Sequence, residues 1–422
     1  MKSFLLKNGW AVSTANEKVE FKDLLIKNGR FCELSTQNSK TEIIDLKESF
    51  IMPGLFDLRC HINQPGISVK ESLNALSEKA VSGGYTSVLA MPALSSMADN
   101  QETIFYTKDS IISKQHINIY LTGCLTLNSK GENLAPLGSL KESGVIAVTD
   151  CPSSTQNNQI YSKAVEYASM FNMPVIELAR DLSLSPEASA HEGLLSLKMG
   201  LKGYPRIAEE LFVSRSILLS KYTNAKIHLT SISSGGSVEL IRGAKKEGVE
   251  ITCDITSNHL CYTEDLIENY DSFAKATPPF RENEDRKALI EGLMDKTIDA
   301  ISTGHQPFSI DDKVKEFDLA PSGVLGLENS FCQAFTELKM ETKEKMLFLA
   351  NTMSRMPAKI LGIKPETFEV GEKANIFVFN PKDKTNLSRE CEKEIGGTNL
   401  PFKSREFDGK IIHTFVNGEK KL

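Results

Sequence analysis

The chain has 422 residues, of which 40% are hydrophobic and 25% charged, and its formal net charge is −6. This composition is ordinary for a globular protein in water. The chain is longer than the size at which one hydrophobic core usually stops growing, so we expect one large domain and a smaller one. The negative net charge argues against an extended nucleic-acid surface, because phosphate binding needs a basic face.

Neither a membrane span nor an export signal is expected. No run of about 18 apolar residues occurs, and the first residues lack the apolar core and cleavage site of a signal peptide. The eight cysteines are scattered without CxxC spacing, which is typical of reduced thiols. We therefore expect a cytoplasmic protein.

Both ends of the chain have sequences typical of β-strands and turns. Short β-like segments fill the first 50 or so residues, where Asn8-Gly9 and Asn28-Gly29 have the sequence of hairpin turns. Strand-like segments at 374–380 and 410–418 stand near the other end. We expect the two ends to form one small β-sandwich.

Between these ends, strands and helices alternate. Strand-like runs stand at 118–123, 145–150, 173–178, 226–231, 251–256 and 298–303, and helical patterns such as 236–247 follow most of them. Alternation over this length predicts parallel strands and a (β/α)8 barrel. We therefore divide the chain into a β-sandwich part at 1–52, the barrel at 53–364 and a second β-sandwich part at 365–422.

The first predicted strand of the barrel ends in the polar residues Asp57, Arg59 and His61. Alternate residues of a strand point to the same face, so these three side chains are predicted to lie together. Barrels carry their chemistry at the carboxyl ends of their strands. The sequence therefore predicts a functional site at this strand end.

Several motifs resemble those of dihydroorotases, which belong to the amidohydrolase superfamily. Residues 51–66, with Asp57-x-Arg59-x-His61 in place of the family's Asp-x-His-x-His, and 83–92 resemble the start of the family's barrel. Ser231-Ile232-Ser233-Ser234 resembles His-x-Ser-Thr, and Asn258-His259-Leu260 resembles His-His-Leu. Further similarity at 278–281, 320–328 and 358–362 extends the resemblance over nearly the whole chain.

The resemblance implies a zinc-dependent hydrolase that opens or closes a cyclic amide, with a metal-activated water and a carboxylate that transfers a proton. Four positions that would carry metal ligands hold other residues: Arg59, Cys151, Leu178 and Ser231. Asp57 and His61 are what remains of the opening motif. Arginine is a permanent cation and leucine has no donor atom, so we expect no intact metal site and no cofactor.

The positions for proton transfer and substrate binding are also changed. The resemblance places the general-base aspartate at Gly304 and a histidine at Phe308, whereas His305 between them is retained. The residues that would hold the substrate fall on Asn63, Ala93 and Thr277. We therefore expect that neither the catalytic set nor the substrate-binding set is intact.

Two questions about this site stay open in the sequence. At most one metal ion could be held, by His61 and Cys151 with Asp57, since histidine and cysteine both suit zinc. Arg59 either pairs with Asp57 or Asp150, because a buried unpaired charge costs several kcal/mol, or receives an anionic ligand.

These residues favour a catalytically inactive dihydroorotase homologue. The resemblance implies a role in pyrimidine synthesis as a scaffold or partner of aspartate transcarbamoylase, and it implies a homodimer. The alternatives are an amidohydrolase of altered chemistry, either mononuclear or metal-free, and an active dihydroorotase with ligands recruited from elsewhere in the chain.

Overall fold

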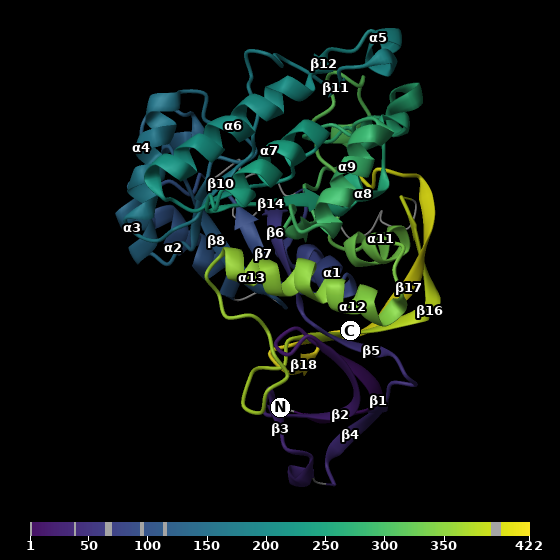
Figure 1. Cartoon of the computed structure of the whole chain (residues 1–422). Helices are drawn as coiled ribbons and strands as arrows, with labels where there is room; N and C mark the ends of the chain where they lie inside the picture. Colours follow the sequence, from purple (N-terminus) through teal and green to yellow (C-terminus); the bar gives the residue numbers. More distant parts are fainter. Residues whose placement is uncertain (1, 38, 64–69, 93–96, 113–115, 390–397) are drawn as a thin grey trace.

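The computed structural model describes residues 2–37, 39–63, 70–92, 97–112, 116–389 and 398–422. Within them, eight parallel strands form a barrel (Figure 1). In sheet order they are β6 (Leu55–His61), β7 (Tyr85–Met91), β8 (Asn118–Cys124), β9 (Ala147–Thr149), β10 (Val175–Glu177), β13 (Ile227–Leu229), β14 (Ile251–Thr256) and β15 (Ala300–Ser302). Just beyond β15, the His61 N–H of β6 donates to the carbonyl oxygen of His305 at 2.8 Å, which joins the two edges. The predicted barrel is confirmed.

Helices cover the outside of the barrel strands (Figure 1). They are α1 (Leu73–Ser82), α2 (Gln101–Ile112), α3 (Leu137–Glu142), α4 (Asn158–Ser169), α6 (Arg206–Thr223), α7 (Gly235–Lys246), α9 (Asn283–Met294) and α11 (Ser330–Glu337). Two more, α12 (Thr342–Ala350) and α13 (Met356–Ile360), lie at the lower end of the barrel in Figure 1. Shorter elements lie between them: α5 (Leu194–Met199), α8 (Ser257–Cys261), α10 (Ile310–Lys313), and the paired strands β11 (Ala190–His191) and β12 (Gly203–Tyr204).

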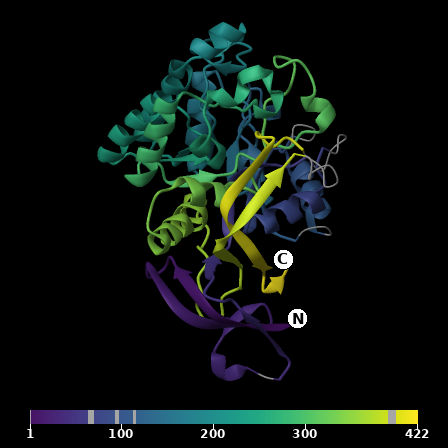
Figure 2. The same cartoon turned by 90° about the vertical axis from the view of Figure 1, so that its right-hand side faces the viewer.

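A second sheet is built from both ends of the chain. Its strands are β1 (Ser3–Ser13), β2 (Lys18–Lys27), β3 (Arg30–Cys32), β4 (Thr41–Asp45), β5 (Phe50–Pro53), β16 (Ile376–Ser388), β17 (Ser404–Val416) and β18 (Glu419–Lys420). Strand β5 lies parallel to β1 and antiparallel to β16, so it links the two ends. Figure 2 shows the long hairpin of β16 and β17 running from this sheet up along the side of the barrel. A flanking β-sheet domain made by both termini is confirmed.

Aromatic packing fastens this hairpin to the barrel. The ring of Phe331 on α11 lies 4.9 Å from the rings of both Phe377 and Phe379 on β16, in edge-on geometry. All three side chains are buried. Edge-on pairs of this kind stabilise by about 0.5–1.5 kcal/mol beyond the area they bury, so Phe331 is a main contact between helix α11 and the β16–β17 hairpin.

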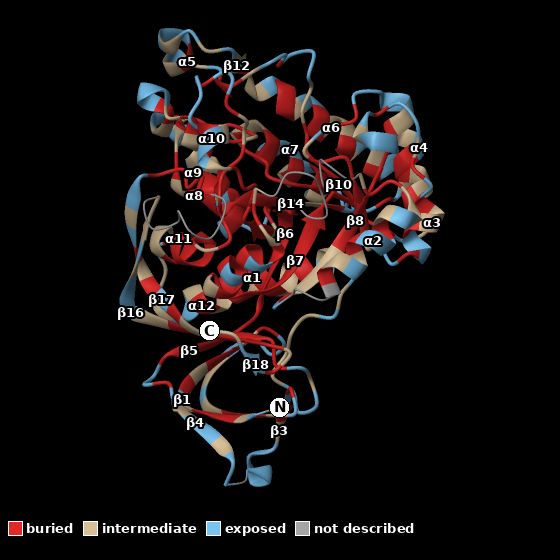
Figure 3. Ribbon diagram, turned by 180° about the vertical axis from the view of Figure 1, so that it is seen from behind, coloured by how far each residue is buried: buried red, intermediate tan, exposed pale blue. Residues whose placement is uncertain are grey.

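The barrel strands are buried along nearly their whole length, as the red colour in Figure 3 shows. One apolar cluster draws residues from β6, β7, β9, β10 and β15, and it includes Leu58, Met91, Cys151 and Leu178. Side chains that point inward from a small barrel fill its interior, so this cluster is a packed core. No helix among the described residues is long and apolar enough to span a membrane.

Candidate functional site at the end of strand β6

The regular alternation of β6 is interrupted at the predicted site. From Asp57 to Cys60, three steps along β6 match two along β7, which is a β-bulge. The Asp57 carboxylate accepts hydrogen bonds from the N–H and the hydroxyl of Thr303, at 2.8 and 2.6 Å. Burial raises the pKa of Asp57 despite these bonds. The prediction that Asp57, Arg59 and His61 share one face is wrong for Asp57, which the bulge turns toward Thr303.

Arg59 is 1% exposed. Its Nη2 donates to the carbonyl oxygen of Thr277 at 3.1 Å, and its guanidinium lies beside the thiol of Cys151. Burial raises the pKa of Cys151, so the thiol stays protonated and neutral. The Asp150 carboxylate accepts hydrogen bonds from the hydroxyl groups of Thr126 and Thr155. Within the described residues no carboxylate pairs with Arg59, so the interpretation that Asp57 or Asp150 neutralises it is wrong.

Two further polar side chains follow Arg59 along the chain. Burial and the nearby charges of Arg59 and His305 hold the pKa of His61 well below its usual range, so the imidazole is neutral at physiological pH. Among the residues that the structure describes, neither Nε2 of His61 nor Nδ2 of Asn63 has a hydrogen-bond partner, although both atoms are buried. Ala93, the other predicted substrate position on this side, lies outside the described residues.

Two of the predicted metal-ligand positions, Leu178 just after β10 and Ser231 just after β13, are engaged in apolar packing and in hydrogen bonding to an internal ion pair. Leu178 is 4% exposed and belongs to the apolar cluster of the barrel. Ser231 has a left-handed backbone, with φ +56°, and its N–H donates to the Asp254 carboxylate at 2.9 Å. Asp254 also pairs with His228, whose Nε2 lies 2.8 Å from it. Both nitrogens of His228 are thus engaged, the other by a threonine hydroxyl, which leaves no lone pair for a ligand.

The segment after β15 also carries no proton-transfer group into the site. Gly304 has φ +61°, and a Cβ atom built on it would lie 2.8 Å from Cγ2 of Thr256. The retained His305 is buried and bonds Glu71 through Nε2 at 2.9 Å. The ring of Phe308 lies beside two lysine ammonium groups, 4.1 and 5.7 Å from its centre. These contacts are structural ones.

The donor set at this strand end does not fit the zinc ion that the resemblance implies. A catalytic zinc site needs three close protein ligands from His, Cys, Asp or Glu. Asp57, His61 and Cys151 are not a group of three with potential ligand atoms within 4.8 Å of one another. The guanidinium of Arg59 lies beside Cys151, and a permanent cation repels a metal ion.

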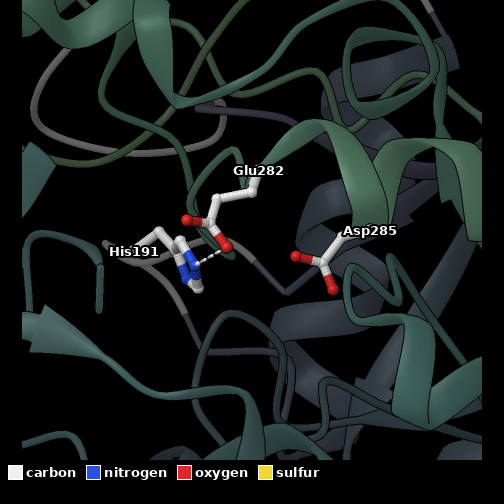
Figure 4. Close-up of side chains that lie close together, drawn as sticks. All are labelled: His191, Glu282 and Asp285. Carbon is white, nitrogen blue, oxygen red and sulfur yellow. Dashed lines mark ion pairs between the residues drawn. The ribbon is translucent and has the colours of Figure 1, made fainter. Parts of the chain in front are cut away.

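A different cluster, which the sequence did not reveal, is shown in Figure 4. Among the described residues, His191, Glu282 and Asp285 are the group of three whose potential ligand atoms lie within 4.8 Å of one another. Arg206 donates to both carboxylates, including Asp285 at 2.7 Å. Arg281 points Nη1 at Nδ1 of His191 at 3.1 Å, and because arginine can only donate, the imidazole proton sits on Nε2.

That tautomer removes the lone pair that a metal would need. Burial and the charges of Arg281 and Arg206 lower the pKa of His191 to about 4, so the ring is neutral, with its one proton on the nitrogen that faces Glu282. We therefore assign the cluster to an ion-pair network. Its members come from β11 and the start of α9, far apart in the sequence, so no local pattern could have indicated it.

Solved structures that share this fold are described as hydantoinases and dihydropyrimidinases. L-Hydantoinase (dihydropyrimidinase) from Arthrobacter aurescens superposes with a TM-score of 0.85, covering 100% of this chain and 96% of that chain at 21% identity. Dihydropyrimidinase from Brevibacillus agri gives 0.86, covering 99% and 94% at 19% identity. At such identities the likeness concerns the fold alone.

Sequence relatives define the family more narrowly. The family described as "Dihydro-orotase-like" matches residues 48–237. Dihydroorotase from Pelobacter propionicus is 36% identical over 422 residues, covering 99% of this chain and 98% of the relative. Dihydroorotase from Caldanaerobacter subterraneus is 36% identical over 417 residues, covering 98% and 96%. The chain belongs to the dihydroorotase family of amidohydrolases.

Proposed function

We propose that this chain is a catalytically inactive dihydroorotase homologue that serves de novo pyrimidine biosynthesis in the cytoplasm as a scaffold or partner of aspartate transcarbamoylase. The observation that carries the loss of catalysis is Arg59. It stands where the resemblance places the first metal ligand, and its guanidinium lies beside the Cys151 thiol and the Thr277 carbonyl.

The positive charge of Arg59 would repel a metal ion at this strand end. Two unit charges about 4 Å apart in a protein site interact by about 4 kcal/mol, so a divalent ion at that distance from a guanidinium meets about 8 kcal/mol of repulsion. Structural zinc binds with about 10–16 kcal/mol when four good ligands are present. A site with fewer ligands and an adjacent cation therefore does not retain the ion.

The missing base adds to this loss. Gly304 offers no carboxylate to accept or return a proton, and removal of a general acid–base group slows such reactions by about 10²–10⁴-fold. Without the metal, the activated water is absent as well. The residues present thus supply neither the nucleophile nor the proton transfer that dihydroorotase chemistry needs.

Metal content and activity test the loss of catalysis. The chain and the Pelobacter propionicus dihydroorotase are purified side by side without chelator, analysed for zinc, and assayed with dihydroorotate and with N-carbamoyl-aspartate. We expect less than about 0.1 equivalent of metal in this chain and no turnover above background, while the relative provides the positive control. Zinc-dependent turnover by this chain would refute the proposal, and one equivalent of zinc without it would favour the mononuclear alternative.

Partnership is tested separately. We expect the chain to copurify with aspartate transcarbamoylase of its own host when the two are co-expressed, and to be a homodimer by analytical ultracentrifugation when expressed alone. A chain that elutes apart from the transcarbamoylase and leaves its activity and stability unchanged would overturn the scaffold role without affecting the argument on catalysis.

A further inference from the structure

At and just after the carboxyl end of β6, three side chains carry buried nitrogen atoms that have no hydrogen-bond partner in the described part of the chain. They are Nε of Arg59, Nε2 of His61 and Nδ2 of Asn63. The intervening Cys60 and Ile62 both belong to the main apolar core outside the barrel. Since successive side chains of an extended segment point to opposite sides, Arg59, His61 and Asn63 face the other way, toward the mouth of the barrel.

Buried nitrogens of this kind are normally satisfied. More than nine in ten buried polar groups in proteins have a partner, and one without a partner destabilises the fold. Three of them on alternate residues of one short segment therefore indicate a ligand with acceptor atoms.

The positive charge of Arg59 indicates that the ligand is negatively charged. Among the described residues, the similarly buried Arg281 lies 3.3 Å from Glu209, and the half-buried Arg215 lies 2.7 Å from Glu177. Arg59 is just as buried, yet within the described part of the chain its partners are a carbonyl oxygen and a thiol. A guanidinium remains charged inside a protein, and a buried charge is tolerated only beside an opposite one.

We propose that the barrel mouth binds a small carboxylate ion through the guanidinium of Arg59, with His61 and Asn63 donating to its remaining acceptor atoms. The planar fork of the guanidinium matches a carboxylate, which accepts two parallel hydrogen bonds. One permanent cation with two uncharged donors balances a single negative charge, which favours a carboxylate over a phosphate dianion. This site does not depend on the proposed partner protein.

Thermal unfolding and calorimetric titration of the full chain test the inference, with acetate, succinate, L-dihydroorotate and inorganic phosphate as probes at constant ionic strength. We expect a saturable rise in Tm with at least one carboxylate and a smaller rise or none with phosphate. Absence of a saturable rise with every carboxylate, or a preference for phosphate, would overturn the proposal.

Substitutions then locate the site. Arg59→Met is expected to weaken carboxylate binding at least tenfold, and Asn63→Ala to weaken it severalfold. The matched control is Arg242→Met, which removes a surface arginine paired with Glu239 and Asp295 and should leave binding unchanged. Equal binding by Arg59→Met and the parent chain would refute the assignment.

The anion-free stability of Arg59→Met separates a binding role from a structural one. Replacing an uncompensated buried charge by an apolar side chain of similar size is often neutral or stabilising. We therefore expect the Tm of Arg59→Met in anion-free buffer to equal or exceed that of the parent chain. A fall of more than about 5 °C, corresponding to about 4 kcal/mol for a chain of this size at about 2.1 cal/mol/K per residue, would make the guanidinium a structural group and overturn the proposal.

Discussion

Gly304 cannot readily accept a side chain in this structure, which bears on whether the lost base could be restored. Its φ of +61° is left-handed, a conformation that costs a residue with a Cβ atom about 1–2 kcal/mol. The new Cβ would lie 2.8 Å from Cγ2 of Thr256, and crowding of this kind costs about 1–3 kcal/mol. We expect Gly304→Ala to lower the free energy of unfolding by about 2–5 kcal/mol, measured by urea titration.

The Thr256→Ser variant separates the two contributions. Serine removes Cγ2 but keeps the hydroxyl, which accepts from the His259 N–H and bonds His259 Nδ1. In this background Gly304→Ala should cost only the backbone part, about 1–2 kcal/mol, so the double-mutant cycle should show the crowding part, about 1–3 kcal/mol, as coupling. If the cost of Gly304→Ala is the same in both backgrounds, or is below about 0.5 kcal/mol, the steric reasoning is wrong. Gly304→Asp should carry the same cost and leave dihydroorotase turnover at background.

Three other predictions concern the barrel and its junction. Phe331→Ala should lose about 3–5 kcal/mol of unfolding free energy because it opens a cavity between α11 and β16, whereas Phe105→Ala, at a residue 51% exposed, should change it by less than about 0.5. Burial alone would raise the pKa of Asp254, but hydrogen bonds led by that from His228 hold it below its ordinary value. The parent chain should therefore be more stable than Asp254→Asn at neutral pH and lose that advantage as the pH falls through the lowered pKa, and an advantage that persists in acid would contradict this. Burial lowers the pKa of Lys313 to about 7, so the folded chain binds fewer protons than the unfolded chain above that pH. Relative to Lys313→Met, the parent should gain stability from about pH 7 upward by at most about 1.4 kcal/mol per pH unit in urea titrations, and a difference that does not vary with pH would exclude this shift.

The alternation of strand and helix patterns along the chain made the fold predictable from the sequence. Repeated strand and helix patterns predict a parallel barrel, since each pattern is set by residues close together in the chain. The loss of a ligand or base at Leu178 and Gly304 can also be predicted from the sequence, because the absence of a donor atom is a property of the residue type. The structure adds that Leu178 is part of a packed apolar cluster, which accounts for its tolerance in the barrel.

The partners of Asp57 and Arg59 were mispredicted from the sequence. A bulge between β6 and β7 depends on how two strands pair, and it turned Asp57 toward Thr303, nearly 250 positions away. Asp57 was therefore engaged elsewhere, and Asp150 is held by the hydroxyls of Thr126 and Thr155. Local alternation carries no information on such pairings.

Residue types and their spacing were enough to identify the family, the barrel and the chemical groups at each strand end. Which of those groups meet depends on how distant segments pack. That packing left a buried guanidinium without a carboxylate among the described residues, with two more donors beside it, because burial and hydrogen-bond satisfaction are properties of surroundings that distant segments create.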